Sequence, residues 1–184
     1  MKILKIIGIA LLAIVAILLI VAAFVRKEYA VEKSIVINKP HAEVYNYVRL
    51  LKNQNQYSKW AKLDPVMRTS FRGTDGTVGF VSAWDSDSSD VGKGEQEIKS
   101  IQEGMRIDYE IRFIKPFEST STAYLTVLPN GENQTKVNWG FNGKMPYPMN
   151  LMIVFMDLEH MIGADLDEGL HNLKTLQEKA PAAN

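Results

Sequence analysis

Two acid–histidine pairs stand near the end of the chain, Asp157-x-x-His160 and Glu168-x-x-His171. Each would place a carboxylate and an imidazole one helical turn apart, as in bundles that hold two iron ions between carboxylates. Such a site needs pairs on separate helices that face one another, and no other helical segment of this sequence carries one. All four side chains fall on the polar side of one amphipathic segment. We therefore predict a solvated helix face and no metal site.

The stretch "WDSDSSDVGKGE" offers oxygen ligands at alternate positions, Asp85, Asp87 and Ser89. A calcium-binding EF-hand loop requires a glycine and a glutamate where this chain has Asp90 and Gln96. The two glycines of the stretch lack the other glycines and the helix of a phosphate-binding loop. None of the three histidines accompanies a recognisable serine nucleophile. The sequence therefore predicts no catalytic residue, no metal ligand and no cofactor.

The composition is that of one globular domain with an additional segment. The chain has 184 residues, of which 46% are apolar and 23% are charged, enough for one domain with a core. Its 21 basic residues equal its 21 acidic residues, and no basic cluster stands out, so nucleic acid is not an expected partner. The absence of cysteine excludes disulfides and thiolate chemistry, but it is compatible with either side of a membrane.

The most apolar segment predicts a membrane anchor. From Ile6 to Val25 the chain carries no charge, and at about 1.5 Å rise per residue a helix of this length spans the roughly 30 Å of bilayer hydrocarbon. We expect Ile6, Leu12, Leu18 and Val25 to lie in the membrane. A cleaved signal peptide is the alternative. Its apolar region is usually about 7–15 residues long, however, and Val21-Ala22-Ala23 resembles its cleavage site only loosely.

Positive charges flank both ends of this segment, so they do not decide its orientation. Lys2 and Lys5 precede it, and four basic residues follow it between positions 26 and 39. We expect a single-pass membrane protein and favour a domain outside the cytoplasm. The predicted units are an anchor at 1–27, one domain at 28–179 and a short disordered tail at 180–184.

The segment after the anchor predicts an antiparallel sheet. "YAVEKSIVIN" has strand character, and "KPHAEVYNYVRLL" has the proline and the apolar spacing of a short amphipathic helix, followed by a helical turn through "NQYSKW". Between Met67 and Asn142 the pattern has period two, with glycine-containing turns. In "MRIDYEIRF" one face is apolar: Met105, Ile107, Tyr109, Ile111 and Phe113. Two further stretches share single faces: Val78, Phe80 and Trp84, and then Val137, Trp139 and Phe141. One sheet face should be covered and the other solvated.

One long helix should cover the apolar face. Pro146 and Pro148 prevent a helix before Met149, after which a pattern of period 3.6 runs to about Lys179. Its apolar stripe consists of Leu151, Phe155, Leu158, Ile162, Leu166, Gly169, Leu173 and Leu176. The continuous apolar run is far shorter than the roughly 17 residues of a membrane span. Met152, Ile153, Val154 and Met156 extend the apolar character, and they would border a cavity, pack under a loop or touch the bilayer near the anchor.

The order of these elements resembles the helix-grip superfamily that groups START lipid-transfer domains, birch-pollen-allergen-like proteins and polyketide cyclases/dehydrases (SRPBCC). The likeness covers roughly residues 28–179. It is carried by "SIVINKPHAEVYNYV", Trp60, "GKGEQEI", "IRFIKPF", "TKVNW" and "GLHNLK". The resemblance implies an α+β helix-grip fold, in which a curved antiparallel sheet wraps round the long C-terminal helix. It also implies a hydrophobic cavity between them for lipids, sterols, polyketides or other apolar molecules.

Apolar side chains on the predicted inner surfaces are the candidate lining of this cavity. They are Trp60, Phe80, Trp84, Tyr109, Phe113, Tyr124, Trp139, Met152, Phe155 and Met156. The expected function is therefore membrane-anchored binding or transport of a hydrophobic small molecule or lipid. One alternative is a cyclase/dehydrase-like enzyme, which would need an ionisable group with a shifted pKa in the cavity. Another is a module that binds a protein partner through its sheet, as in the chaperone-stimulating branch of the superfamily.

Overall fold

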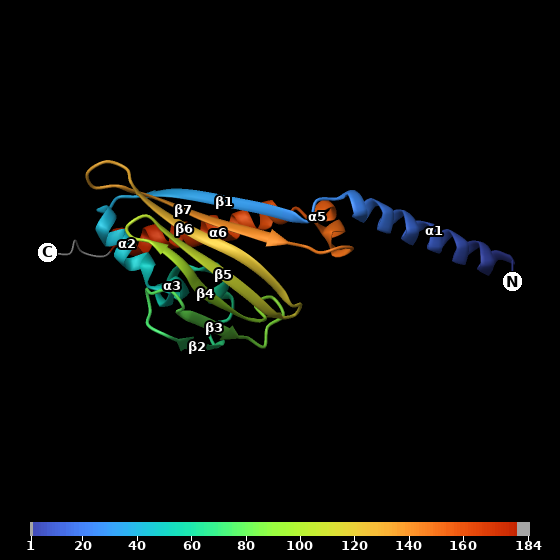
Figure 1. The fold of residues 1–184 in the computed structure, drawn as a ribbon, viewed down its shortest axis with the longest axis horizontal. Coiled ribbons are helices and arrows are strands. Elements are labelled where there is room, and N and C mark those ends of the chain that lie inside the picture. Colours follow the sequence, from blue (N-terminus) through green and yellow to red (C-terminus); the bar gives the residue numbers. More distant parts are fainter. Residues whose placement is uncertain (1, 180–184) are drawn as a thin grey trace.

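The computed structural model describes residues 2–179, and it shows a curved sheet, a long helix against it and a further helix that projects from one end (Figure 1). The helices are α1 (Lys2–Phe24), α2 (His41–Arg49), α3 (Gln54–Tyr57), α4 (Lys59–Leu63), α5 (Met152–Phe155) and α6 (Leu158–Lys179). The strands are β1 (Glu28–Ile37), β2 (Arg68–Arg72), β3 (Val81–Asp85), β4 (Lys93–Gln102), β5 (Arg106–Lys115), β6 (Ser119–Pro129) and β7 (Thr135–Lys144). Short 3-10 helices at Leu51–Asn53 and Met149–Leu151 precede α3 and α5.

The strands form one antiparallel sheet in the order β1-β7-β6-β5-β4-β3-β2. Strands β2 to β7 follow one another as hairpins, and β1 closes the other edge by pairing with β7. Gly104 and Gly131 occupy turns with φ of 74° and 100°, a backbone conformation that glycine adopts without steric cost. The antiparallel sheet predicted between Met67 and Asn142 and the strand predicted before it are therefore confirmed.

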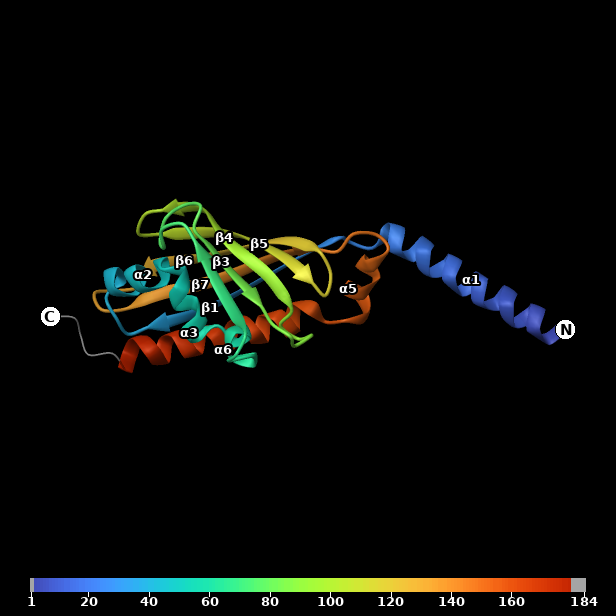
Figure 2. The same ribbon diagram turned by 90° about the horizontal axis from the view of Figure 1, so that it is seen from below.

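The sheet has an inner face toward α6 and an outer face toward solvent (Figure 2). Along β5, Ile107, Tyr109, Ile111 and Phe113 lie on the inner face, and the charged residues between them lie on the outer face. The alternation predicted for this strand is thus confirmed from Ile107 to Phe113, but the expectation for Met105 is wrong, since it lies in the turn before β5 and is exposed. The whole is the expected α+β helix-grip fold, a curved antiparallel sheet packed against a long C-terminal helix.

Helix α6 approaches the sheet closely because two of its residues have no side chain. A β-carbon on Gly169 would lie 2.7 Å from Cζ3 of Trp139, and one on Gly163 would lie 2.9 Å from Cε of Lys33. The helix packs along β1, and the edge of the Trp139 ring rests against it at Gly169. Close packing of a tryptophan ring on a helix backbone excludes even one methyl group.

The core fills the inner face beneath α2, α3 and α6. Trp139 meets Tyr57 edge-on, with ring centroids 5.7 Å apart, and it meets Trp60 at 6.3 Å. The fully buried aliphatic side chains include Ile37, Val44, Ile98, Ile107, Leu125, Val127, Val137, Leu170 and Leu173. These residues come from β1, β4, β5, β6 and β7 and from helices α2 and α6, so the core joins most of the sheet to these helices.

The predicted start of the long helix at Met149 is wrong. The chain extends at Met156, with φ of −112° and ψ of 128°, and α6 begins at Leu158. The reason is a helix cap: the side chain of Asp157 accepts a hydrogen bond of 3.0 Å from the backbone N–H of His160. Phe155 therefore leaves the predicted stripe, and 74% of its surface is exposed.

Two smaller expectations about buried faces are also wrong. Val78 lies in the turn before β3 and is exposed, whereas Phe80 and Trp84 lie on the inner face as predicted. In the last turns of α6, Leu176 is exposed while Leu170 and Gln177 are buried. The buried side of the helix is therefore rotated slightly from the predicted stripe.

Helix α1 has the length and composition that a membrane crossing requires, and in the described residues 2–179 no second helix meets both conditions. Its side chains are almost all exposed. A signal sequence near an N-terminus has the same length and composition, so α1 has the properties of a membrane anchor and of a signal sequence alike.

The contact between Trp139 and α6 generates a prediction about two glycines. Gly169→Ala should lower the free energy of unfolding by about 1–3 kcal/mol, because the new methyl group would overlap a buried, immobile ring. Gly163→Ala is the matched control on the same helix. It meets the movable end of Lys33, so it should be neutral or stabilising by up to about 1 kcal/mol. Urea unfolding of both variants measures the difference, and equal effects would contradict the proposed packing.

Candidate functional site

The inner face of the sheet differs between its two ends. In the middle of β4 and near the start of β5, the side chains of Ile98 and Ile107 are wholly buried, and Ile101 beside them is partly buried. Toward the other end the apolar side chains are only partly buried. We name this group the apolar inner end; it consists of Tyr29, Trp60, Trp84, Ile111, Phe113 and Ile162. These residues come from β1, α4, β3, β5 and α6, so they lie on the inner face of the sheet or on the helices beside it.

A glycine shapes the middle of the apolar inner end. Gly94 pairs with Trp84 on one side and with Phe113 on the other, and a β-carbon at this position would lie 2.5 Å from the indole ring. The rings of Trp84 and Phe113 meet edge-on with centroids 6.0 Å apart. The indole N–H donates to the carbonyl of Val91 at 3.2 Å, so the ring presents carbon atoms toward the inner side.

Helix α4 carries Trp60 and is held to α6 by an ion pair. Nζ of Lys59 lies 2.6 Å from Oδ1 of Asp165 and 3.5 Å from Glu168. The hydrogen bond to Asp165 raises the pKa of Lys59 above its usual value. One turn further along α6, Asn172 donates to the carbonyl of Tyr57 at 3.1 Å. These contacts fix where the Trp60 ring lies relative to the helix.

The structure separates the ten predicted lining residues into four groups. Trp60, Trp84 and Phe113 belong to the apolar inner end. Phe80, Tyr109 and Trp139 lie on the same face but are at most 2% exposed, as parts of the core. The hydroxyl of Tyr109 is buried without a hydrogen-bond partner among the described residues. Burial raises the pKa of Tyr109 well above its usual value, so this phenol stays protonated and can only offer a neutral hydroxyl.

Tyr124 lies on the opposite face, so its assignment to the cavity is wrong. Its hydroxyl donates to Oε2 of Glu32 at 2.5 Å, and the guanidinium carbon of Arg106 lies 4.0 Å from its ring centroid. Tyr124 pairs across the sheet with Asp108 and Gly140, both on the outer face. The alternation of its strand predicts this position, since Ala123 and Leu125 on either side are buried.

Met152, Phe155 and Met156 lie outside the inner face as well. They belong to α5 and the extended residue after it, beside the end of α1. Their placement follows from the break before α6, which turns this segment away from the sheet. Ile111, Tyr29 and Ile162 take part in the apolar inner end instead. Ile111 was identifiable from the alternation of its strand, but the positions of Tyr29 and Ile162 depend on how β1 and α6 pack.

Carboxylates and imidazoles are absent from the buried residues of the part of the chain that the structure describes. In residues 2–179 the buried polar side chains are Lys39, Ser58, Ser86, Gln96, Ser121, Thr135, Asn150 and Gln177. Gln96 exchanges hydrogen bonds with Gln54, at 3.2 and 3.3 Å. Within that range no aspartate, glutamate or histidine is buried. The inner surface can therefore bind an apolar molecule and hydrogen-bond to it, but it holds no buried carboxylate or imidazole for proton transfer.

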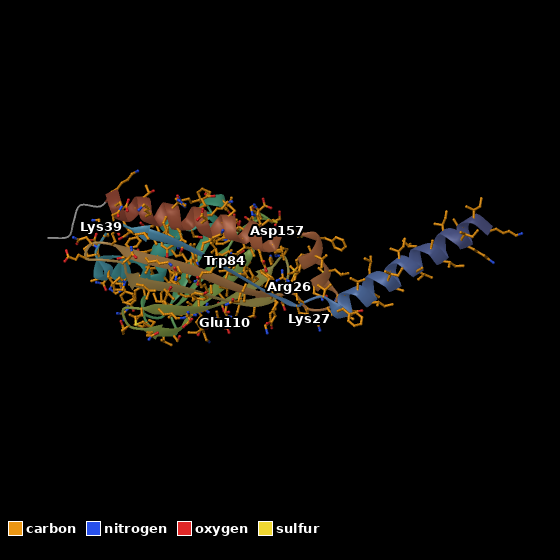
Figure 3. All side chains as sticks on the ribbon, turned by 90° about the horizontal axis from the view of Figure 1, so that it is seen from above. Arg26, Lys27, Lys39, Trp84, Glu110 and Asp157 are labelled. Carbon is orange, nitrogen blue, oxygen red and sulfur yellow. The ribbon has the colours of Figure 1, made fainter. Side chains whose placement is uncertain are left out.

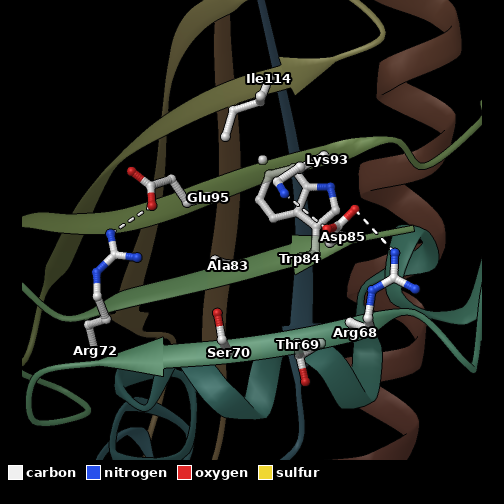
Figure 4. Close-up of a pocket in the computed structure, with 11 residues that line it drawn as sticks. Arg68, Thr69, Ser70, Arg72, Ala83, Trp84, Asp85, Lys93, Glu95 and Ile114 are labelled. Carbon is white, nitrogen blue, oxygen red and sulfur yellow. Dashed lines mark hydrogen bonds and ion pairs between the residues drawn. The ribbon is translucent and has the colours of Figure 1, made fainter. Parts of the chain in front are cut away.

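Two surface hollows are formed by other parts of the described chain. One, of about 320 Å³, lies over β2 to β4, and its lining includes Trp84 and Gly94 beside the charged side chains of the outer face (Figure 4). Its charges are paired: Asp85 with Arg68 and Lys93, and Glu95 with Arg72. The other, of about 430 Å³, is a groove between α2 and the end of α6. Neither lies between the sheet and the middle of α6, where the sequence predicted a cavity.

The motifs that resembled metal sites have other roles in the structure. Asp157 caps α6, and Glu168 lies near Lys59. His171 contacts the carbonyl and carboxylate of Asp167. In the hairpin loop, Arg68 binds both Asp85 and Asp87. Over the range that the coordinates describe, no cluster of three aspartate, glutamate or histidine residues is arranged to hold a metal ion.

Comparison with known proteins identifies the domain. Residues 29–178 match the protein family described as "Polyketide cyclase / dehydrase and lipid transport". Among proteins with curated functions, no sequence matches the chain. Similar solved structures exist, however, and they cover most of the chain beyond α1.

Three solved structures illustrate the likeness. Norcoclaurine synthase from Thalictrum flavum, in complex with dopamine and hydroxybenzaldehyde, is 10% identical with a TM-score of 0.58, over 84% of this chain and 89% of that chain. A protein from Mesorhizobium loti is 13% identical with a TM-score of 0.60, over 83% and 99%. Ara h 8.0201 is 13% identical with a TM-score of 0.57, also over 83% and 99%. At these identities the likeness establishes the fold alone.

The cap at the start of α6 can be tested against the metal interpretation. Asp157→Ala should lower the free energy of unfolding by about 0.5–2 kcal/mol, because an orphan N–H of the first turn loses its acceptor. Asp157→Asn should retain most of the stability, and His160→Ala should cost little. Unfolding is followed by circular dichroism with and without added zinc. A zinc-dependent rise in stability that requires both Asp157 and His160 would contradict the capping role.

Arg112 on the outer face predicts a pH-dependent contribution to stability. Its hydrogen bond to Glu97 is the largest cause of the lowered pKa of Glu97. Arg112 also hydrogen-bonds Glu95, whose pKa is lowered mainly by Arg72 and further by Arg112. A lowered folded pKa gives stability that is present above the unfolded pKa near 4.5 and is lost as the pH falls through the folded value. Arg112→Met should therefore be less stable than the native chain at pH 7. The difference in the free energy of unfolding between the two proteins should become smaller below pH 4.5.

The matched control is Lys136→Met, which removes an exposed cation from the outer face of β7. Its stability difference from the native chain should change much less over the same pH range. Urea unfolding at several pH values measures both gaps. A gap for Arg112→Met that widens in acid would show that the paired carboxylates do not carry the effect.

Proposed function

Because the chain belongs to the polyketide cyclase/dehydrase and lipid transport family, we propose that it binds a hydrophobic small molecule or lipid at the apolar inner end while α1 anchors it in a membrane. The observation that carries this proposal is the contrast along the inner face. Several aromatic and aliphatic side chains are left partly exposed toward one end of the inner face, beside a fully buried core.

The chemistry of this surface favours a largely apolar ligand. Trp60, Trp84 and Phe113 offer ring faces and edges, and the indole N–H of Trp84 is already engaged by a backbone carbonyl. Partly exposed aromatic surface of this kind gains free energy when an apolar molecule displaces water from it. Gln96 and Ser121 are the buried polar side chains nearest in register, because both pair with Ile111. Gln96 already hydrogen-bonds Gln54, so the hydroxyl of Ser121 suits a single polar group on the ligand.

Binding is favoured over catalysis by the same residues. A cyclase or dehydrase moves protons, which requires an acid or a base at the bound molecule. The described inner face supplies protonated phenols, amides and a serine, and its carboxylates lie on solvated surfaces. The norcoclaurine synthase structure, with dopamine and hydroxybenzaldehyde bound, supports the idea that this fold accepts small aromatic molecules.

The proposal can be tested with a photoreactive amino acid in the full-length chain. p-Benzoylphenylalanine is incorporated in place of Phe113 in cells that express the protein, and the cells are irradiated with ultraviolet light. The chain is then purified and its mass is measured by mass spectrometry. We expect an adduct of defined mass from a small apolar molecule, because the benzophenone would lie on the apolar inner end. Trp84→Ala in the same chain should reduce the adduct, since it removes half of the aromatic surface at that point.

Tyr124 provides the matched control because it is an aromatic residue of the same sheet on the outer face. Benzoylphenylalanine at this position should give no such adduct. Equal labelling at both positions would indicate nonspecific capture. No adduct at Phe113 or at Trp60 would refute ligand binding at the apolar inner end.

A further inference from the structure

The segment before α6 leaves large apolar side chains in the open at the end of the domain that carries α1. We name this group the apolar collar; it consists of Phe24, Tyr147, Met149, Val154 and Phe155. Their exposed fractions range from 46% at Tyr147 to 88% at Phe24. These side chains lie outside the core of the domain. Helix α5 lies beside the last turn of α1 (Figures 1 and 2).

The apolar collar is held firmly to the end of α1. The side-chain amide of Asn150 donates to the carbonyl of Ala22 at 2.7 Å and to that of Val25 at 2.9 Å. Carbonyls at a helix C-terminus lack partners within the helix, so this amide closes the end of α1. Asn150 and Ala22 are both fully buried. The contact therefore fixes the apolar collar relative to the helix axis.

Two further contacts restrict the movement of α1 relative to the domain. Arg26 forms an ion pair of 2.9 Å with Glu159 in the first turn of α6, and the N–H of Met145 donates to the carbonyl of Lys27 at 2.8 Å. Figure 3 shows Arg26 and Lys27 at the junction between α1 and the domain. The direction of α1 is thus coupled to α6 and to the end of β7.

Helix length places the apolar collar at a bilayer boundary if α1 crosses the membrane. The 23 residues of α1 extend about 34 Å, slightly more than the roughly 30 Å of hydrocarbon. The last turn of α1, which contacts Asn150, then lies where the acyl chains meet the headgroups. Exposed phenylalanine, tyrosine and methionine beside basic residues suit that boundary, because the rings enter the acyl region while the charges stay among the phosphates.

We propose that the apolar collar is a membrane-docking surface that inserts into the outer part of the lipid layer next to α1. This inference rests on the proposed function, since it requires α1 in the bilayer. It assigns a role to the segment that carries Met152, Ile153, Val154 and Met156, for which the sequence left cavity, loop and bilayer open. The domain then sits directly on the membrane with the α1 end of its fold toward the lipid, and a bound lipid would have a short path to the apolar inner end.

The absence of cysteine from the chain makes a depth measurement possible. Single variants Leu12→Cys, Val154→Cys, Phe155→Cys and Glu132→Cys of the full-length protein are spin-labelled and reconstituted into phosphatidylcholine vesicles. Collisions of each label with oxygen, which concentrates in lipid, and with a water-soluble nickel chelate are then compared. Leu12 reports the insertion of α1, and Glu132, in the exposed turn between β6 and β7, reports bulk water.

We expect the oxygen-to-nickel collision ratio at Val154 and Phe155 to be several-fold higher than at Glu132 and lower than at Leu12. A ratio at both positions equal to that at Glu132, with Leu12 in the bilayer, would overturn the docking inference and leave the anchor intact. Exclusion of both reagents at Val154 and Phe155 would also overturn it, because a protein surface would then cover the apolar collar. A water-exposed label at Leu12 would refute the anchor itself, and the docking inference with it.

Discussion

The close contact between α6 and the sheet at Trp139 governs the rest of the structure. Since Gly169 has no side chain, the tryptophan ring lies against the helix backbone, and α6 settles along β1 and β7. Strands β2 to β4 lie farther from α6, and Gln54 of α3 hydrogen-bonds Gln96 on the inner face of β4. A methyl group at this point would push the helix outward, which would loosen the core and change how much of the apolar inner end is exposed.

The same placement of α6 determines what lies at its beginning. Asp157 caps the helix where it reaches the end of the sheet, and the chain before the cap turns outward. That turn carries Asn150 to the end of α1 and leaves Val154 and Phe155 exposed. The candidate binding surface and the candidate membrane surface are therefore produced by one packing arrangement, on the same end of the domain.

The distribution of polar groups is consistent with binding by shape and apolar contact. Charges on the outer face neutralise one another, as Arg112 does with Glu95, Glu97 and Glu110. The buried phenols of Tyr57 and Tyr109 have pKa values raised by burial and stay neutral. A ligand that approaches the inner face would meet few groups that need to be desolvated, which keeps the cost of binding an apolar molecule low.

Much of the architecture was predictable from the sequence, because backbone periodicity is a local property. Alternation in β5 identified which side of the strand is buried, and the long apolar run identified α1 as one exposed helix. The same alternation in β6 identifies Tyr124 as an outer residue, since both its neighbours are buried. The tertiary structure alone decided which partly buried residues meet, because Tyr29, Trp60, Trp84 and Ile162 lie far apart in sequence. It also decided where α6 begins, since a capping carboxylate and the position of the sheet edge outweigh the apolar spacing that continues through Phe155.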